Sequence, residues 1–158
     1  MKIPFKAVAV DMDGTFLNDQ RSYDHQLFDQ VLTKLEKHDI RFIVASGRPF
    51  ARLKNDFPEF IDRMDFVTAN GSRLIVEGKE VAVEGLSKQQ AINLINFVHN
   101  KYGSMATMVY GRKKAYIGTE APAKDKKFLQ YFAKESTEIS DWQNIPDDVF
   151  IELTFHYD

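Results

Sequence analysis

The chain has 158 residues, with 21 Lys and Arg against 23 Asp and Glu, so its formal charge is −2. That length fits one domain, or one domain with part of a second. The near-neutral charge argues against a nucleic-acid surface, and no apolar run approaches the roughly 20 residues that span a bilayer. The chain contains no cysteine, which excludes disulfides, thiolate metal sites and a cysteine nucleophile. We therefore expect a soluble, cytoplasmic protein with an ordinary apolar core.

Short apolar runs alternate with helical patterns in the first half of the chain. Residues 7–10 and 42–45 are continuous apolar runs, as expected for strands buried on both faces, and residues 66–69 are a third strand candidate. Apolar residues recur at helical spacing across residues 24–38, and Pro49 suits the first turn of a further helix. This order predicts a doubly wound parallel sheet, in which ligands bind at the edge formed by the carboxyl ends of the strands.

The second half predicts an α+β unit with antiparallel pairing. Hairpins are expected over residues 73–83 and 105–117, and a capping-box pattern at Ser87 begins a helix between them. Pro122 opens a weaker helical pattern, and residues 149–155 alternate as in a half-buried strand.

The change of pattern places a domain boundary near residues 82–86, so that the expected domains are residues 1–82 and 83–158. Three parallel strands make a thin sheet for this architecture, and the chain stops directly after a strand pattern. We therefore expect an incomplete α/β core followed by part of a second domain. A proteolytic fragment, a truncated reading frame and half of a split assembly would each fit.

Two carboxylates separated by one residue, Asp11 and Asp13, follow the first expected strand. In extended backbone the side chains of residues i and i+2 point to the same side. Two adjacent anions repel each other unless a cation or a proton relieves them, and carboxylate oxygens are ligands that Mg²⁺ prefers. The pair therefore predicts a magnesium site, with a solvated acidic turn as the alternative.

Polar residues also follow the second and third strands. Ser46 and Gly47 offer a hydroxyl and backbone N–H groups that suit an anion at the start of a helix, although an ordinary strand-to-helix turn is the alternative. Arg48 is a candidate substrate contact or one half of a surface ion pair. Asn70 is a second candidate contact, for which a simple Asn-Gly turn is the alternative. Three polar strand ends at one edge of a sheet indicate a functional site more strongly together than any one of them does alone.

These residues resemble motifs of a known family. Residues 6–17, Lys-Ala-Val-Ala-Val-Asp-Met-Asp-Gly-Thr-Phe-Leu, are similar to the first motif of the haloacid dehalogenase (HAD) superfamily of phosphatases. Ser46-Gly47-Arg48 resembles the second motif of its Cof-type sugar-phosphate phosphatases, and residues 67–71 resemble the segment before the cap in that subgroup. The resemblance implies a HAD-like Rossmannoid core, incomplete here, followed by part of a type-two α+β cap that excludes water and reads the leaving group.

The resemblance also implies a Mg²⁺-dependent phosphomonoester hydrolase that acts on sugar phosphates or similar small molecules. Asp11 would be the nucleophile that forms an aspartyl-phosphate, and Asp13 would be the general acid and then the general base. The Asp11 carboxylate and the Asp13 backbone carbonyl would hold Mg²⁺. Ser46 and the Gly47 N–H would bind the phosphoryl oxygens, and Thr15 would brace the loop beside them.

Members of this family also carry a lysine and an acidic pair on later core strands, and the sequence contains neither in a matching position. We therefore expect negligible turnover from the isolated chain. A catalytically silent phosphate-binding or interaction module is the alternative function, and a receiver-like phosphoacceptor domain is a third that the hairpin-rich second half argues against. The expected partners are a small phosphate ester and either a second copy or a complementing C-terminal fragment, with no nucleic acid and no membrane.

Overall fold

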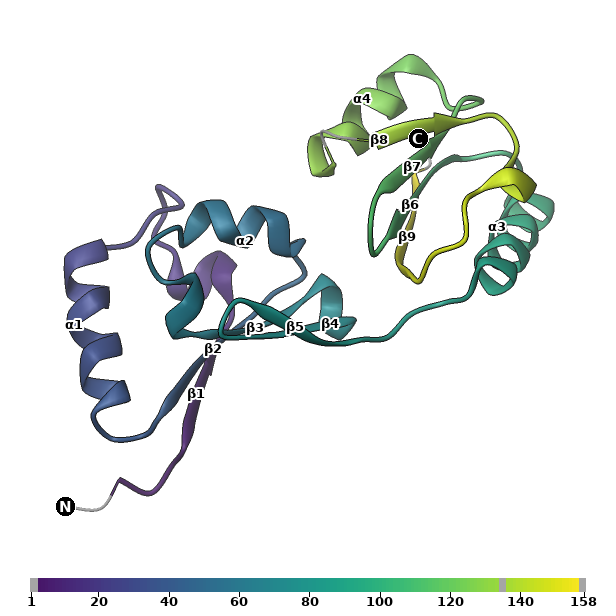
Figure 1. The fold of residues 1–158 in the computed structure, drawn as a ribbon. Helices are drawn as coiled ribbons and strands as arrows, with labels where there is room; N and C mark the ends of the chain where they lie inside the picture. Colours follow the sequence, from purple (N-terminus) through teal and green to yellow (C-terminus); the bar gives the residue numbers. More distant parts are fainter. Residues whose placement is uncertain (1–2, 134–135, 157–158) are drawn as a thin grey trace. The chain divides into compact units, whose positions relative to one another are not determined.

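The computed structural model describes residues 3–133 and 136–156 of the chain. The chain divides into two compact units, residues 1–82 and 83–158 (Figure 1). Each unit contains a sheet and an apolar core of its own. Within the described ranges, none of the helices has the length and apolar character needed to cross a membrane.

The first unit is built on a five-stranded sheet with strand order β1-β2-β3-β4-β5. Its strands are β1 (Ala7–Val10), β2 (Arg41–Ala45), β3 (Asp65–Thr68), β4 (Arg73–Val76) and β5 (Lys79–Val83). The first three strands run parallel, and β4 returns antiparallel to β3. The predicted α/β class, with three parallel strands at the start of the chain, is confirmed.

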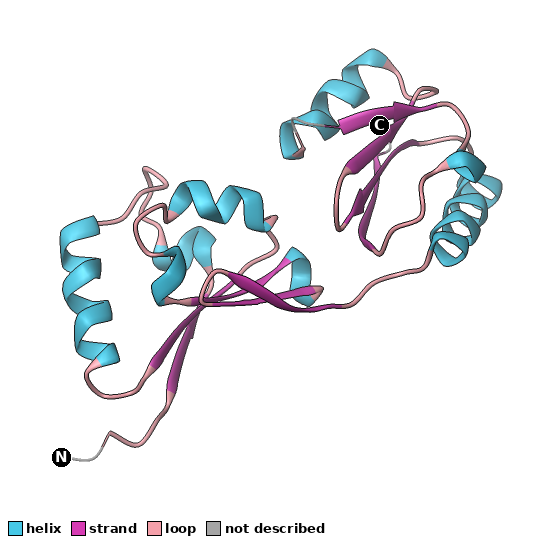
Figure 2. Ribbon diagram, viewed as in Figure 1, coloured by secondary structure: helices cyan, strands magenta, loops and turns pink. Residues whose placement is uncertain are grey.

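Two helices, α1 (His25–Glu36) and α2 (Phe50–Asp56), connect the parallel strands (Figure 2). α1 begins where the carboxylate of Asp24 accepts a hydrogen bond from the N–H of Leu27 at 2.9 Å, which satisfies one of the free donors of its first turn. Because β1, β2 and β3 follow one another in a single direction, right-handed crossovers place both helices on the same face of the sheet. A shared core holds their buried side chains together with those of β2 and β3, and its larger members are Phe28, Leu32, Phe42, Phe50, Leu53, Phe57 and Phe66.

Neither α1 nor α2 covers the opposite face of this sheet. Ala7 and Ala9 of β1 are exposed there, while Val8 and Val10 are only half-buried. The expectation that residues 7–10 form a strand buried on both faces is therefore wrong. The reason is that successive side chains of a strand point to opposite faces, and both connecting helices pack on one of them.

The second unit has a four-stranded sheet with strand order β8-β7-β6-β9. The strands are β6 (Ala106–Gly111), β7 (Ala115–Gly118), β8 (Ser136–Ile139) and β9 (Phe150–His156). β6 pairs antiparallel with both β7 and β9, but β7 and β8 run parallel. The expectation of antiparallel pairing throughout this unit is therefore wrong at β8, because a helix between β7 and β8 returns the chain to the same end of the sheet.

That helix is α4 (Ala123–Phe132), which follows Pro122, and the unit begins with α3 (Lys88–Tyr102). α3 packs Ile92 and Ile95 against one face of the sheet, whereas α4 packs Leu129 against the other. The predicted capping box is present: the N–H of Gln90 donates to Oγ of Ser87 at 3.3 Å, and the N–H of Ser87 donates to Oε1 of Gln90 at 2.9 Å. The helix therefore begins where the sequence pattern placed it.

Candidate active site

The loops that follow β1, β2 and β3 are tied together by hydrogen bonds at one edge of the first sheet. The N–H of Ser46 donates to the carbonyl of Val67 at 2.9 Å, and the N–H of Ala69 donates to the carbonyl of Arg48 at 3.3 Å. Arg48 in turn reaches Asp13 in the loop after β1. The structure therefore brings together the three strand ends that the sequence singled out.

The loop after β1 is one wide turn over residues 12–16. It is closed by hydrogen bonds from the N–H of Phe16 to the Asp11 carbonyl, at 3.1 Å, and from the N–H of Leu17 to the Met12 carbonyl, at 2.9 Å. Met12 is fully buried, with 0% of its surface exposed. Asp11 and Asp13, on either side of it, are exposed, as is Thr15. The buried methionine thus anchors a turn that presents both carboxylates to solvent.

The guanidinium of Arg48 bridges two carboxylates. It donates from Nε and Nη2 to the two oxygens of Asp13, at 3.2 Å and 2.6 Å. Its Nη1 donates to Oδ2 of Asp56, the last residue of α2, at 2.7 Å. Burial lowers the pKa of Arg48, but the hydrogen bonds to Asp13 and Asp56 outweigh it and hold this pKa above its ordinary value. The charge of Asp13 is therefore compensated by a permanently cationic side chain.

The loop after β2 folds back on itself. Oγ of Ser46 accepts a hydrogen bond from the N–H of Arg48 at 3.2 Å, and α2 begins after Pro49. A Cβ at Gly47 would lie 2.8 Å from Oδ1 of Asn70, so a larger residue would displace the Asn70 side chain. Asn70 itself is in the left-handed region, with φ 54° and ψ 32°, which asparagine tolerates. The side chain of Asn70 thus lies directly against Gly47, between the second and third strand ends.

The turn of residues 12–16, together with Asp11 before it, offers two protein oxygens as ligands for a magnesium ion. The Asp11 carboxylate is exposed, and it has no hydrogen-bond or ion-pair partner within the part of the chain that the structure describes. The backbone carbonyl of Asp13 is a second hard donor in the same turn. No group of three or more His, Cys, Asp or Glu side chains suited to a metal occurs among the described residues. Mg²⁺ commonly binds through one or two carboxylates and keeps several waters, which is compatible with this small donor set.

Asp56 is the residue at this site that the sequence did not indicate. It lies eight positions after Arg48, outside every recognisable motif, and only the fold shows that the two side chains meet. Its backbone carbonyl accepts a hydrogen bond from the hydroxyl of Tyr23 at 3.0 Å. Burial, together with the charges of Glu59 and Asp56, raises the pKa of Tyr23 to about 12, so that this hydroxyl remains a donor across the physiological range.

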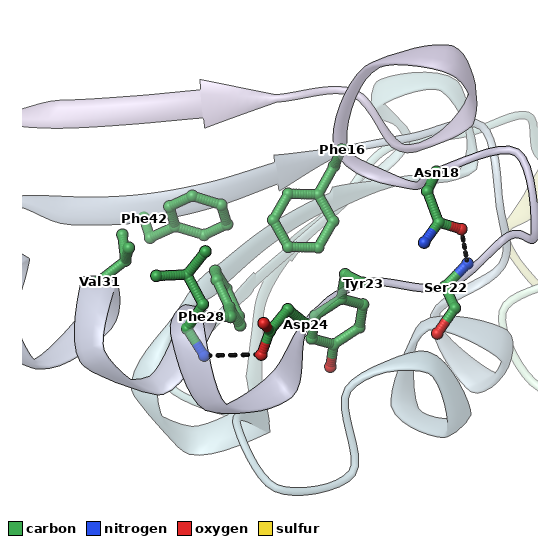
Figure 3. Close-up of a pocket in the computed structure, with 9 residues that line it drawn as sticks. Phe16, Asn18, Ser22, Tyr23, Asp24, Phe28, Val31 and Phe42 are labelled. Atoms are coloured by element: carbon green, nitrogen blue, oxygen red, sulfur yellow. Dashed lines mark hydrogen bonds between the residues drawn. The ribbon is translucent and has the colours of Figure 1, made fainter.

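A pocket of about 350 Å³ lies in the first unit beside α1 (Figure 3). Aromatic side chains account for much of its lining, and Phe16, Tyr23 and Phe28 converge on it. Asn18 shapes the loop above the pocket by accepting a hydrogen bond from the N–H of Ser22 at 3.0 Å. Neither Asp11 nor Asp13 lines this pocket. The pocket is therefore separate from the two strand-end carboxylates, although Phe16, which lines it, belongs to the same turn of residues 12–16.

The sequence matches the family model of the haloacid dehalogenase-like hydrolases over residues 8–158. The chain belongs to this family, and the resemblance seen in its first two motifs is confirmed.

Among curated proteins, the chain is similar to the 5-amino-6-(5-phospho-D-ribitylamino)uracil phosphatase YbjI of Escherichia coli (strain K12), with 30% identity over 145 residues. The match covers 92% of this chain and 53% of that protein. The chain therefore spans about half the length of the curated relative it matches.

Solved structures give the same picture of the fold. SMU.1108c from Streptococcus mutans UA159 aligns with a TM-score of 0.84 and 32% identity, covering 95% of this chain and 56% of that one. The HAD subclass IIB sugar phosphatase BT4131 aligns with a TM-score of 0.63 and 16% identity, covering 90% and 56%. Because the identity with BT4131 is low, its similarity to this chain supports the fold alone. Both alignments show a HAD fold that is represented here in part.

Proposed function

We propose that this chain carries the nucleophile half of a Mg²⁺-dependent phosphomonoesterase, with Asp11 as the residue that becomes phosphorylated. The observation that supports the proposal is the turn of residues 12–16, which exposes Asp11 while Arg48 holds the neighbouring Asp13. A free carboxylate next to a fixed one gives a nucleophile and an acid–base group within one short loop.

In the proposed reaction, a carboxylate oxygen of Asp11 attacks the phosphorus atom and the bond to the leaving oxygen breaks. Asp13 starts the cycle protonated and gives its proton to that oxygen, and the carboxylate left behind later takes a proton from the water that attacks the aspartyl-phosphate. Ser46 and the N–H of Gly47 would bind the phosphoryl oxygens. Mg²⁺, held by the Asp11 carboxylate and the Asp13 carbonyl, would screen the charge of the phosphate from that of the nucleophile.

The proposed substrate is a small phosphate ester. YbjI is named as the phosphatase of a ribitylamino-uracil phosphate, which is a small phosphorylated molecule. Residues 1–82 would be the N-terminal part of the core domain, and residues 83–158 would be part of the cap that selects the leaving group. Asn70 and Arg48 would lie near that group, because they border the phosphate-binding loop.

Asparagine substitutions test the two assigned roles in a protein of the relatives' length that contains this sequence. Asp11→Asn is expected to abolish hydrolysis of sugar phosphates, because an amide cannot form the phosphoenzyme. Asp13→Asn is expected to lose about 10²–10⁴-fold, the usual contribution of general acid–base catalysis. Steady-state assays with Mg²⁺, and with excess EDTA as the metal-free comparison, measure both.

Asp39→Asn is the matched control, since Asp39 is an exposed aspartate before β2 with a positive φ that asparagine also adopts. It is expected to leave the rate unchanged. Hydrolysis at the wild-type rate by Asp11→Asn would refute the assignment of the nucleophile.

A catalytically silent phosphate-binding module is the second candidate. It is favoured by the small donor set, since no cluster of three metal-binding side chains is found in the described ranges. Phosphate and Mg²⁺ binding without turnover, in a protein of the relatives' length, would decide for this candidate.

A further inference from the structure

We propose that Asp56 and Arg48 form a relay that fixes the carboxylate of Asp13, so that Asp56 is a positioning residue for the reaction although it lies outside the strand-end loops. The catalytic part of this inference rests on the proposed function. Its structural part concerns the orientation of one side chain and stands by itself.

The bridge has a defined geometry. A guanidinium is planar and presents its donors in a fixed fork. The edge formed by Nε and Nη2 contacts both oxygens of Asp13, at 3.2 Å and 2.6 Å, while Nη1 contacts Asp56 at 2.7 Å. Once Nη1 is held, the direction of the other edge is set. Asp56 therefore determines where the two acceptor oxygens of Asp13 can lie.

Asp56, at one end of this relay, is held in place by its surroundings, whereas Asp13, at the other end, is held only by Arg48 in the described part of the chain. Asp56 ends α2 and is followed by Phe57, which is fully buried with 0% exposure. Its carbonyl also accepts the hydroxyl of Tyr23. Asp13, by contrast, has 64% of its side chain exposed, and the described residues give its carboxylate no hydrogen bond other than those from Arg48. Without the relay, the Asp13 side chain would be free to rotate into solvent.

Stability alone is a weak explanation for this arrangement. Ion pairs with an exposed partner usually contribute only about 0–1 kcal/mol, and Asp13 is largely exposed. The Arg48 side chain nevertheless has only 13% of its surface exposed, and its backbone is fixed at both ends by Ser46 and Ala69. A largely buried cation that contacts both oxygens of an exposed carboxylate acts on the orientation of that carboxylate.

The chain offers a matched comparison in Arg63. This arginine also bridges two acidic side chains, Glu36 and Asp29, but it contacts none of the strand-end loops. Substitution of Glu36 removes one of the two carboxylates that Arg63 bridges, just as substitution of Asp56 removes one of the two that Arg48 bridges. Glu36→Ala is therefore the control for Asp56→Ala, and Asp56→Asn is the conservative variant that keeps an oxygen acceptor.

The decisive experiment uses the 158-residue chain and needs no turnover. In ¹⁵N-edited NMR spectra, the Nε–H of Arg48 should be protected and shifted downfield in the wild type, and this signature should vanish in Asp13→Ala, which removes its acceptor. The relay predicts that Asp56→Ala also loses most of it, that Asp56→Asn retains part of it, and that Glu36→Ala leaves it unchanged. An Arg48 signal unaltered in a folded Asp56→Ala would overturn the relay.

The catalytic arm separates positioning from substrate binding. In a protein of the relatives' length, Asp56→Ala should lower kcat for sugar phosphates about 10-fold with KM nearly unchanged, less than the 10²–10⁴-fold loss of a whole acid–base group. Hydrolysis of p-nitrophenyl phosphate should fall only about twofold, because its leaving group needs little protonation. A rise in KM alone would show instead that Arg48 contacts substrate. If the wild type hydrolyses neither ester, the proposed function fails, and the NMR result still decides the relay.

Discussion

At the scale of single residues, Glu152 on β9 carries a carboxyl group whose ionised form is disfavoured by burial. Burial raises its pKa, opposed by a hydrogen bond that the hydroxyl of Thr154 donates to Oε1 at 3.3 Å. Burial also raises the pKa of Tyr110 on the neighbouring strand, and the charge of Glu152 adds to that shift. No ion-pair partner for Glu152 occurs in the described part of the chain. The ionised form of Glu152 therefore opposes folding of the second unit.

This carboxyl group predicts a pH-dependent gain in stability from Glu152→Gln. The pKa of Glu152 is higher in the folded state than in the unfolded state. Below the unfolded-state pKa the group is protonated in both states and costs no stability. As the pH rises through the folded-state pKa, the native state loses stability. The variant keeps the acceptor for Thr154 but cannot ionise, so it should melt at a higher temperature than wild type at pH 7 and at about the same temperature near pH 4. Thermal melts at both values measure this.

Glu84→Gln, at an exposed position of the same unit, is the control and should melt as the wild type does at both pH values. A stabilisation by Glu152→Gln that is equally large at pH 4 would show that ionisation of this group is not the cause.

At the scale of elements, the helix starts are held by short-range hydrogen bonds that can be removed singly. Ser87→Ala deletes the side chain that caps α3 while leaving the buried face of the helix intact. The expected cost is about 1 kcal/mol, typical for the loss of such a cap, seen as a lower midpoint in urea. Ser104→Ala, at an exposed site after the end of α3, should change the midpoint little. Equal effects of the two substitutions would contradict the capping role.

The elements that could be predicted from the sequence are those with a strong local signal. The continuous apolar runs and the helical spacing of residues 24–38 located β1, β2 and α1 to within a few residues. β8 was missed because Ser-Thr-Glu-Ile offers little strand pattern, and its parallel pairing with β7 depends on where α4 returns the chain. The burial of β1 was misjudged because apolar side chains do not reveal how many faces are covered.

The candidate site also contains residues that could be predicted from the sequence and contacts that only the fold reveals. Asp11, Asp13, Ser46 and Gly47 stand out in the sequence because polar residues directly follow apolar strands. Arg48 could be singled out by its position, but its partners could not, since Asp13 and Asp56 are joined to it only by the fold. The roles of these residues in catalysis remain predictions.

At the scale of the whole molecule, the first sheet has an open side. β1 is the terminal strand of its sheet, and Leu74 of β4 and Val81 of β5 are 36% and 56% exposed. Unpaired edges recruit other strands, and exposed apolar surface favours association. We expect the 158-residue chain to self-associate or to be only marginally stable, and to hydrolyse phosphomonoesters well below the usual range of about 1–10³ s⁻¹.

Light scattering over a concentration series, together with a phosphatase assay, measures both properties. Ala9→Lys places a charge on an exposed position of β1 and should reduce association. A stable wild-type monomer with ordinary turnover would contradict both the expected association or marginal stability and the expected low turnover.

We expect the loop after β1 to bind Mg²⁺ through the Asp11 carboxylate and the Asp13 backbone carbonyl, and titration of the 158-residue chain with Mg²⁺ tests this expectation most directly. Calorimetry should give one weak site, because only two protein oxygens are offered and water completes the shell. NMR shifts should be largest at residues 11–15. Asp11→Asn combined with Asp13→Asn should remove the site, while Asp39→Asn should preserve it. Binding that is unchanged in the double variant would contradict the account.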